Sequence, residues 1–171
     1  HKYPNDLKYA SFNGRKWATE AIDSEGGNPA ANTSLKHGPD GHQAISYSDD
    51  TNKDLKYATF DGRKWTTQTI DSEGRVGSFT SLAFRASGQP AISYCDFRDL
   101  KYASYDGQRW ITQTIDRAGQ IGGYSSLAFS PAGQPGIAYV DKFSGDLKYA
   151  YEVIVKKEGA VLKSASGNAE K

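Results

Sequence analysis

The five residues Asp54-Leu55-Lys56-Tyr57-Ala58 belong to a motif that occurs four times along the chain. The copies begin about 45 to 48 residues apart, a period typical of repeat proteins that build one four-stranded sheet per unit. The four copies are Asp6–Ala10, Asp54–Ala58, Asp99–Ala103 and Asp146–Ala150. Such a repeat predicts the architecture of the chain more strongly than it predicts an activity.

The two middle units share more than the motif. Residues 55–71 read LKYATFDGRKWTTQTID, and residues 100–116 read LKYASYDGQRWITQTID. Both units also contain Ser-Leu-Ala-Phe and Gly-Gln-Pro between their motifs. This similarity indicates that one structural unit was duplicated at a fixed period.

Each unit divides into four short segments that favour β-strands. In the third unit these segments are residues 81–84, 91–95, 100–105 and 110–115. Between the last two lies Asp106-Gly107, which predicts a two-residue hairpin turn, because both central residues of that turn need positive φ. Since no segment has helical periodicity, the sequence predicts an all-β protein with four-stranded antiparallel blades.

The third strand of a unit carries apolar or amphipathic side chains on both of its faces. On one face lie Leu55 and Tyr57, and on the other lie Ala58 and Phe60. This pattern predicts that neighbouring sheets cover both faces, as in a β-propeller, whereas the more polar last strand predicts an outer edge. We therefore predict a β-propeller over residues 1–163 and a flexible tail over residues 164–171.

The number of units bears on how such a propeller would close. The chain opens with the last two strands of a unit, and its final unit has no Gly-Trp hairpin after Ala150, so it holds about three and a half units. Propellers usually need at least four blades. Two alternatives follow: the chain is part of a longer propeller, or two copies form a homo-oligomer that completes a seven-bladed ring.

The units resemble the LKYA, DG-x-x-W, ID, SL, G-x-P and ISY-x-D repeats of bacterial extracellular β-propeller proteins. This resemblance covers about residues 6–150 and implies a secreted, extracellular location. The units are also similar to the Asp-box (BNR) repeats of sialidase-like propellers, in which an acidic-Gly hairpin precedes a Trp. Residues 104–110 are one residue shorter than an Asp-box and lack its Thr. In those families the Asp-box stabilises the fold, so this similarity implies no sialidase chemistry.

Composition excludes several classes of partner. The 171 residues include 21 basic and 20 acidic side chains, a formal net charge of +1, which predicts no nucleic-acid partner because phosphate binding needs a clustered positive excess. No apolar run is long enough to span a bilayer. Cys95 is the only cysteine and lies in an apolar segment, which favours a small buried thiol.

Trp17, Trp65 and Trp110 recur behind the predicted hairpin turns and are candidate ligand-binding residues. In a functional interpretation they are aromatic platforms for sugar rings, one per blade, whose modest affinities combine by avidity. In a structural interpretation each Trp packs across its hairpin onto the neighbouring blade, which the fixed spacing favours.

Asp49, Asp96 and Asp141 recur where the second strand of each unit ends, and they are also candidate ligand-binding residues. Ion pairing gives them an alternative role, because lysine recurs in every motif and can reach the strand ends. These lysines are Lys8, Lys56, Lys101 and Lys148.

Two further segments partly resemble metal sites. Residues 50–54 have the Asp-x-Asn-x-Asp spacing of a calcium loop but lack its glycine and its bidentate Glu, which favours a plain hairpin loop. His37 and His42 depart from the other units, and a diverged loop is favoured there over a metal centre. We therefore predict neither a metal nor a cofactor.

The repeats favour binding over catalysis. The sequence contains no His-containing triad motif and no phosphate-binding Gly-rich loop before a helix. An active site needs an asymmetric set of groups, and near-identical units do not supply one. We predict a non-enzymatic, lectin-like module that binds glycans. The alternatives are a structural, adhesion or protein-interaction propeller, and a fragment of a glycosidase or polysaccharide lyase.

Overall fold

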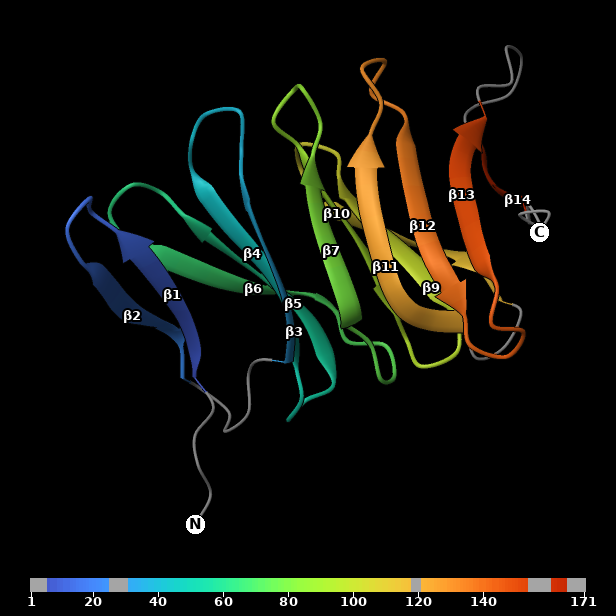
Figure 1. The fold of residues 1–171 in the computed structure, drawn as a ribbon, viewed down its shortest axis with the longest axis horizontal. Helices are drawn as coiled ribbons and strands as arrows, with labels where there is room; N and C mark the ends of the chain where they lie inside the picture. Colours follow the sequence, from blue (N-terminus) through green and yellow to red (C-terminus); the bar gives the residue numbers. More distant parts are fainter. Residues whose placement is uncertain (1–5, 25–30, 118–120, 154–160, 166–171) are drawn as a thin grey trace.

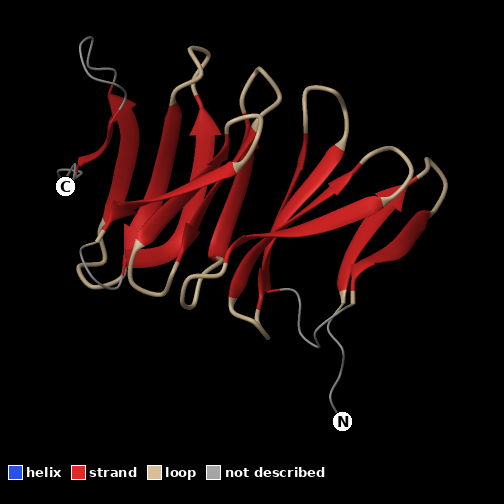
Figure 2. Cartoon of the chain, turned by 180° about the vertical axis from the view of Figure 1, so that it is seen from behind, coloured by secondary structure: helices blue, strands red, loops and turns tan. Residues whose placement is uncertain are grey.

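The computed structural model describes residues 6–24, 31–117, 121–153 and 161–165. They form fourteen β-strands in four antiparallel sheets, with no helix among these residues. The sheets stand in a row from the amino-terminal to the carboxy-terminal end of the chain (Figure 1), and Figure 2 shows the same row from behind. In these ranges nothing has the length and apolarity of a membrane-spanning helix.

The first sheet is a two-stranded hairpin, and each of the other three has four strands paired in chain order. The hairpin consists of β1 (Leu7–Phe12) and β2 (Trp17–Asp23). The four-stranded sheets are β3 (Ala31–His37), β4 (Gln43–Asp49), β5 (Asp54–Phe60) and β6 (Trp65–Asp71); β7 (Ser78–Phe84), β8 (Pro90–Cys95), β9 (Leu100–Tyr105) and β10 (Trp110–Asp116); and β11 (Ile121–Phe129), β12 (Pro135–Asp141), β13 (Leu147–Val153) and β14 (Val161–Ala165). The predicted three and a half four-stranded antiparallel units are confirmed.

The hairpins that precede each Trp have longer turns than the sequence predicted. Between β5 and β6 the loop is Asp61–Lys64, closed by the Asp61 amide, which donates to the Lys64 carbonyl at 3.2 Å. Gly62 has φ +89°, whereas Asp61 acts through its side chain, whose Oδ1 accepts the amides of Arg63 and Lys64 at 2.8 and 2.9 Å. The predicted two-residue turn is therefore wrong: the acidic residue caps a four-residue loop and does not itself adopt positive φ.

Successive sheets are joined along their first strands, β3, β7 and β11. The backbone amide of Leu82 donates to Ser34 Oγ of the preceding sheet at 3.1 Å, and the amide of Leu127 donates to Ser81 Oγ at 3.0 Å. The same serine position thus makes the same bond at two successive junctions. The repeat therefore specifies contacts between units as well as the strands within them.

The apolar core lies between the sheets in three clusters. One joins the hairpin to the second sheet and includes Leu7, Ile45 and Tyr47. The other two fill the spaces between the second and third sheets and between the third and fourth, with Leu55 and Leu100 fully buried. The two middle strands of the third sheet are almost wholly buried, and the outer strand β6 is largely exposed. Coverage of both sheet faces and an exposed last strand are thus confirmed.

The carboxy-terminal boundary differs slightly from the prediction. β14 pairs with β13 as far as Ala165, opposite Tyr149, so residues 164 and 165 belong to a strand and not to a tail. Residues 166–171 lie outside the described part of the chain. Within that part the sheets form an open row, so closure into a propeller ring remains a prediction.

Candidate functional site

The three repeated tryptophans each begin the last strand of a unit, directly after the hairpin turn. Trp65 packs on Tyr9 of the preceding sheet, with ring centroids 5.3 Å apart, and Trp110 packs on Tyr57 in the same way at 5.2 Å. Trp17 packs only against Phe12 of its own hairpin among the aromatic contacts described, and it is 68% exposed. The repeated Trp therefore has different surroundings in different units.

Trp65 and Trp110 differ in the hydrogen bonding of their indole N–H groups. Trp65 Nε1 donates to Glu20 Oε1 of the preceding sheet at 3.1 Å. Trp110 Nε1 is buried and has no acceptor among the described residues. Gln68 occupies the position of Glu20 in the register, because it pairs with Tyr57 as Glu20 pairs with Tyr9. A buried unsatisfied donor costs about 1–3 kcal/mol, so the difference between these two sites needs an explanation.

A pocket of about 550 Å³ lies at Trp110, between the second and third sheets. Tyr57, Tyr105 and Trp110 supply aromatic surface, while polar groups come from both sheets. Burial raises the pKa of Tyr57 to about 12, so its hydroxyl stays protonated at neutral pH. The polar side chains are Gln68, Gln108 and Arg109, with Thr59, Thr69 and Pro90 completing the wall.

The predicted acidic residues lie at the opposite ends of the strands from the tryptophans: Asp49 and Asp141 end β4 and β12, and Asp96 directly follows β8. Asp49 Oδ1 accepts the amides of Thr51 and Asn52 at 2.9 and 3.1 Å. Asp96 and Asp141 cap their turns through equivalent bonds. The structure therefore does not bring the six predicted residues into one site, and it leaves ligand binding at these carboxylates a prediction.

A buried Tyr–Asp–Lys cluster recurs at every junction between sheets. In the middle one, Asp71 Oδ2 accepts the Tyr94 hydroxyl at 2.6 Å and Lys101 Nζ at 2.5 Å. Burial raises the pKa of Asp71, but hydrogen bonds from Lys101 and Tyr94 outweigh it and hold the pKa below its usual value. Burial and the bond to Asp71 raise the pKa of Tyr94. The equivalent clusters are Asp23 with Tyr47 and Lys56, and Asp116 with Tyr139 and Lys148.

These clusters modify the predicted lysine pairing. Lys148 pairs with Asp141 at 2.7 Å as expected, and Lys56 approaches Asp49 at 4.0 Å. Lys101, however, pairs with Asp71 of the preceding sheet, just as Lys56 pairs most closely with Asp23 of the sheet before it, at 2.5 Å. The sequence feature that indicates this pairing is the acidic residue at the end of each unit, in Ile22-Asp23, Ile70-Asp71 and Ile115-Asp116.

The two segments that partly resemble metal sites form local turns. Lys53 lies at positive φ in the β4–β5 turn, and Asn52 Nδ2 donates to Asp49 Oδ2 at 2.8 Å. In the β3–β4 turn, Asp40 accepts the His42 amide at 3.0 Å and approaches His42 Nδ1 at 3.2 Å. Among the residues that the structure describes, no group of three metal-ligating side chains comes together.

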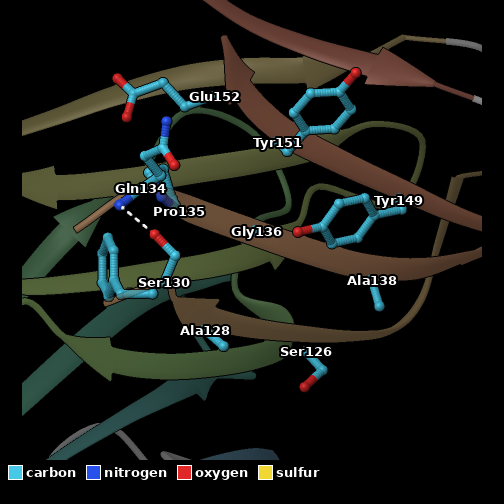
Figure 3. A pocket seen from close by; sticks show the side chains of 11 residues that line it. Ser126, Ala128, Ser130, Gln134, Pro135, Gly136, Ala138, Tyr149, Tyr151 and Glu152 are labelled. Carbon is cyan, nitrogen blue, oxygen red and sulfur yellow. Dashed lines mark hydrogen bonds between the residues drawn. The ribbon is translucent and has the colours of Figure 1, made fainter. Parts of the chain in front are cut away.

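A second cavity of about 550 Å³ lies on the outward face of the fourth sheet (Figure 3). Tyr149 and Tyr151 line it with their rings nearly parallel, 5.7 Å apart and inclined by 16°. The Tyr149 ring lies over Gly136, where an added Cβ would leave it no room. The aromatic surface of this sheet is thus open to solvent where the preceding sheets are covered.

Comparisons with known proteins add little. No protein-family model matches the chain, and no curated protein matches it. Among solved structures, the chain is similar to a fucose lectin from Kordia zhangzhouensis, solved in complex with methyl-fucoside. The two share 13% sequence identity with a TM-score of 0.49, over 80% of this chain and 100% of the lectin. At these values the similarity carries no argument about the ligand, which has to come from the geometry of the chain itself.

Proposed function

We propose that the chain is a non-enzymatic carbohydrate-binding module whose binding site is the pocket at Trp110, between the second and third sheets. The observation that supports this proposal is the buried Trp110 N–H, which has no acceptor among the described residues and lies beside the pocket. An oxygen of a ligand that displaces the atoms covering this N–H would satisfy that donor. The proposal extends to an extracellular location, where surface glycans are available as ligands.

The chemistry of the pocket matches a sugar better than an apolar ligand or an ion. Aromatic rings pack against the C–H faces of a sugar, and amide and guanidinium groups bond to its hydroxyls. Gln68, Gln108 and Arg109 supply such groups around the rings of Tyr57 and Trp110. A cavity of about 550 Å³ is within the range that accommodates a small ligand.

A protein-interaction or structural role is the second candidate, and Trp65 supports it. This side chain is engaged by Tyr9, Phe60 and Glu20, as expected of a residue that only joins neighbouring sheets. If Trp110 has the same role, its pocket is a packing gap. The two candidates differ in whether a soluble glycan occupies that pocket.

The proposal is tested by screening the folded chain on a glycan array and measuring the affinity of each hit by calorimetry. Arg109→Ala is expected to weaken binding about tenfold, because it removes a charge-assisted hydrogen bond. Lys64→Ala is the matched control, since Lys64 has the same place in the hairpin before Trp65. Trp110→Phe, which keeps an aromatic ring but removes the N–H, is also expected to weaken binding.

Two results would overturn the proposal. An array that stays blank with a sample shown to be folded by circular dichroism would favour the protein-interaction role. Equal losses of affinity for Arg109→Ala and Lys64→Ala would place the sugar elsewhere on the molecule.

A further inference from the structure

Two of the three junctions between sheets follow one pattern, in which a Trp of one sheet packs on a Tyr of the sheet before it; the fourth sheet contains no Trp. The ring centroids are 5.3 Å apart for Trp65 and Tyr9, and 5.2 Å apart for Trp110 and Tyr57. Each of these two junctions therefore has two different halves: a face that presents Trp and a face that presents Tyr. Tyr57 is only 6% exposed because the Trp-bearing face of the next sheet covers it.

The two ends of the row each expose one half of this junction. The β1–β2 hairpin presents Trp17, and Phe12 beside it is also exposed. At the opposite end, β13 presents Tyr149 at the position of Tyr57, and this side chain is 51% exposed. Figure 1 shows the hairpin and the fourth sheet at opposite ends of the row.

The open face of the fourth sheet matches the covered faces in other respects. Ser126 occupies the place in β11 that Ser34 and Ser81 occupy in β3 and β7, where their Oγ atoms accept an amide of the next sheet. Ser126 and Tyr149 both line the cavity on this face, and Figure 3 shows the two residues on its wall. The cavity is therefore the half-junction that a further Trp-bearing face would fill.

We propose that a second copy of this chain covers the face, with Trp17 of one copy packed on Tyr149 of the next. A second copy is the expected partner of this face because the two Trp–Tyr junctions within the chain join the same two residue types in the same direction. A net charge of +1 offers little repulsion between copies. Because the two joined faces differ, the association is head to tail, and it closes into a ring when the rotation between copies allows.

The junction between copies is smaller than those within the chain. The hairpin corresponds to the last two strands of a unit. It therefore lacks the first strand, whose amide bonds Ser34 or Ser81 at the junctions within the chain, and the second strand, which carries Tyr47 in the second sheet. The Tyr–Asp–Lys cluster is therefore incomplete between copies, and we expect association to depend on protein concentration. One consequence rests on the proposed function: a sugar pocket of the Trp110 kind would form between copies, with Trp17 contributed by one of them.

The test is the mass in solution, measured by sedimentation over a range of concentrations without added sugar. The wild type is expected to exceed the 18.6 kDa of one chain, and Trp17→Ala and Tyr149→Ala are each expected to raise the dissociation constant about 30-fold. Phe97→Ala is the matched control, because it removes an aromatic ring that is 69% exposed but belongs to the turn between β8 and β9 of the third sheet, not to either end of the row. Circular dichroism verifies that each variant is folded.

A mixture of the two variants provides the sharpest result. Trp17→Ala keeps an intact Tyr149 face, and Tyr149→Ala keeps an intact Trp17 face, so the mixture can form one wild-type junction and is expected to restore dimers. A wild type that stays at 18.6 kDa at every concentration would overturn the proposal, as would a mixture that remains monomeric. Since no sugar is present, these outcomes are independent of the glycan experiment.

Discussion

Replacing Asp71 with alanine is expected to destabilise the fold more than any exposed substitution. The Asp71 side chain is nearly buried between the second and third sheets, and its carboxylate accepts the Tyr94 hydroxyl at 2.6 Å and Lys101 Nζ at 2.5 Å. Without Asp71, the Lys101 ammonium group stays inside the junction and loses its charge partner. The Tyr94 hydroxyl loses its acceptor at the same time.

The expected magnitude follows from this geometry. Removing one partner of a buried ion pair costs about 3–5 kcal/mol, because the other charge is left uncompensated. A domain of ordinary stability unfolds with about 5–15 kcal/mol, so the variant would lose a large part of its total. At about 2 kcal/mol per molar urea, the unfolding midpoint falls by about 2 M.

The assay is urea unfolding at pH 7, followed by circular dichroism and tryptophan fluorescence. Thr112→Ala serves as the control, because Thr112 is exposed on β10 and such changes stay within about 0.5 kcal/mol. A midpoint for Asp71→Ala within error of this control would refute the reasoning. It would mean that the cluster contributes nothing to the junction between the two sheets.

Three further predictions concern acid stability, the buried thiol and one glycine. The pKa of Asp71 is depressed in the folded state, so its stabilising effect is present above the unfolded pKa and is lost as pH falls through the folded pKa. Urea titrations between pH 7 and pH 3 should therefore show less acid destabilisation for Asp71→Ala than for wild type. Equal slopes of unfolding free energy against pH for the two proteins would contradict this. Burial raises the pKa of the Cys95 thiol to about 12, so Ellman's reagent should react only after unfolding, and rapid labelling of the native protein would show that the site is open. Gly77→Ala should lower the melting temperature further than Gly74→Ala does. Both residues have positive φ, but only at Gly77 would an added Cβ lie 2.8 Å from the Asp54 carbonyl oxygen. Equal shifts of the melting temperature would rule out that close contact.

The strands and the positions of the turns could be predicted from the sequence because the interactions that form them are local. The apolar side chains on both faces of residues 55–60 reflect sheets on both sides, and Tyr57 on one face and Ala58 on the other are buried. Gly62 and Gly107 mark hairpins because their positive φ is a property of the turn itself. Neither prediction required knowledge of how one unit is placed on the next.

The ion pairs could be predicted only in part, since they depend on that placement. Lys101 and Asp96 are close in sequence, which made their pairing the simple expectation. The actual partner, Asp71, is brought to Lys101 by the packing of two sheets against each other, a relation that no spacing within one unit encodes. The sequence shows that an acidic residue recurs at the end of each unit. It does not show that this side chain contacts the following sheet.

The candidate site shows why the repeat alone could not locate function. Trp65 and Trp110 are equivalent in sequence, yet Glu20 accepts the N–H of one, while Gln68 holds the same register position beside the other. A carboxylate only accepts hydrogen bonds, whereas an amide brings two donors of its own. The change from Glu to Gln therefore replaces one of two acceptor oxygens with an amide nitrogen, which adds donors to those of Trp110 and Arg109. A pocket with surplus donors is best matched by a ligand rich in oxygen acceptors, so binding is expected where the units differ and packing where they agree.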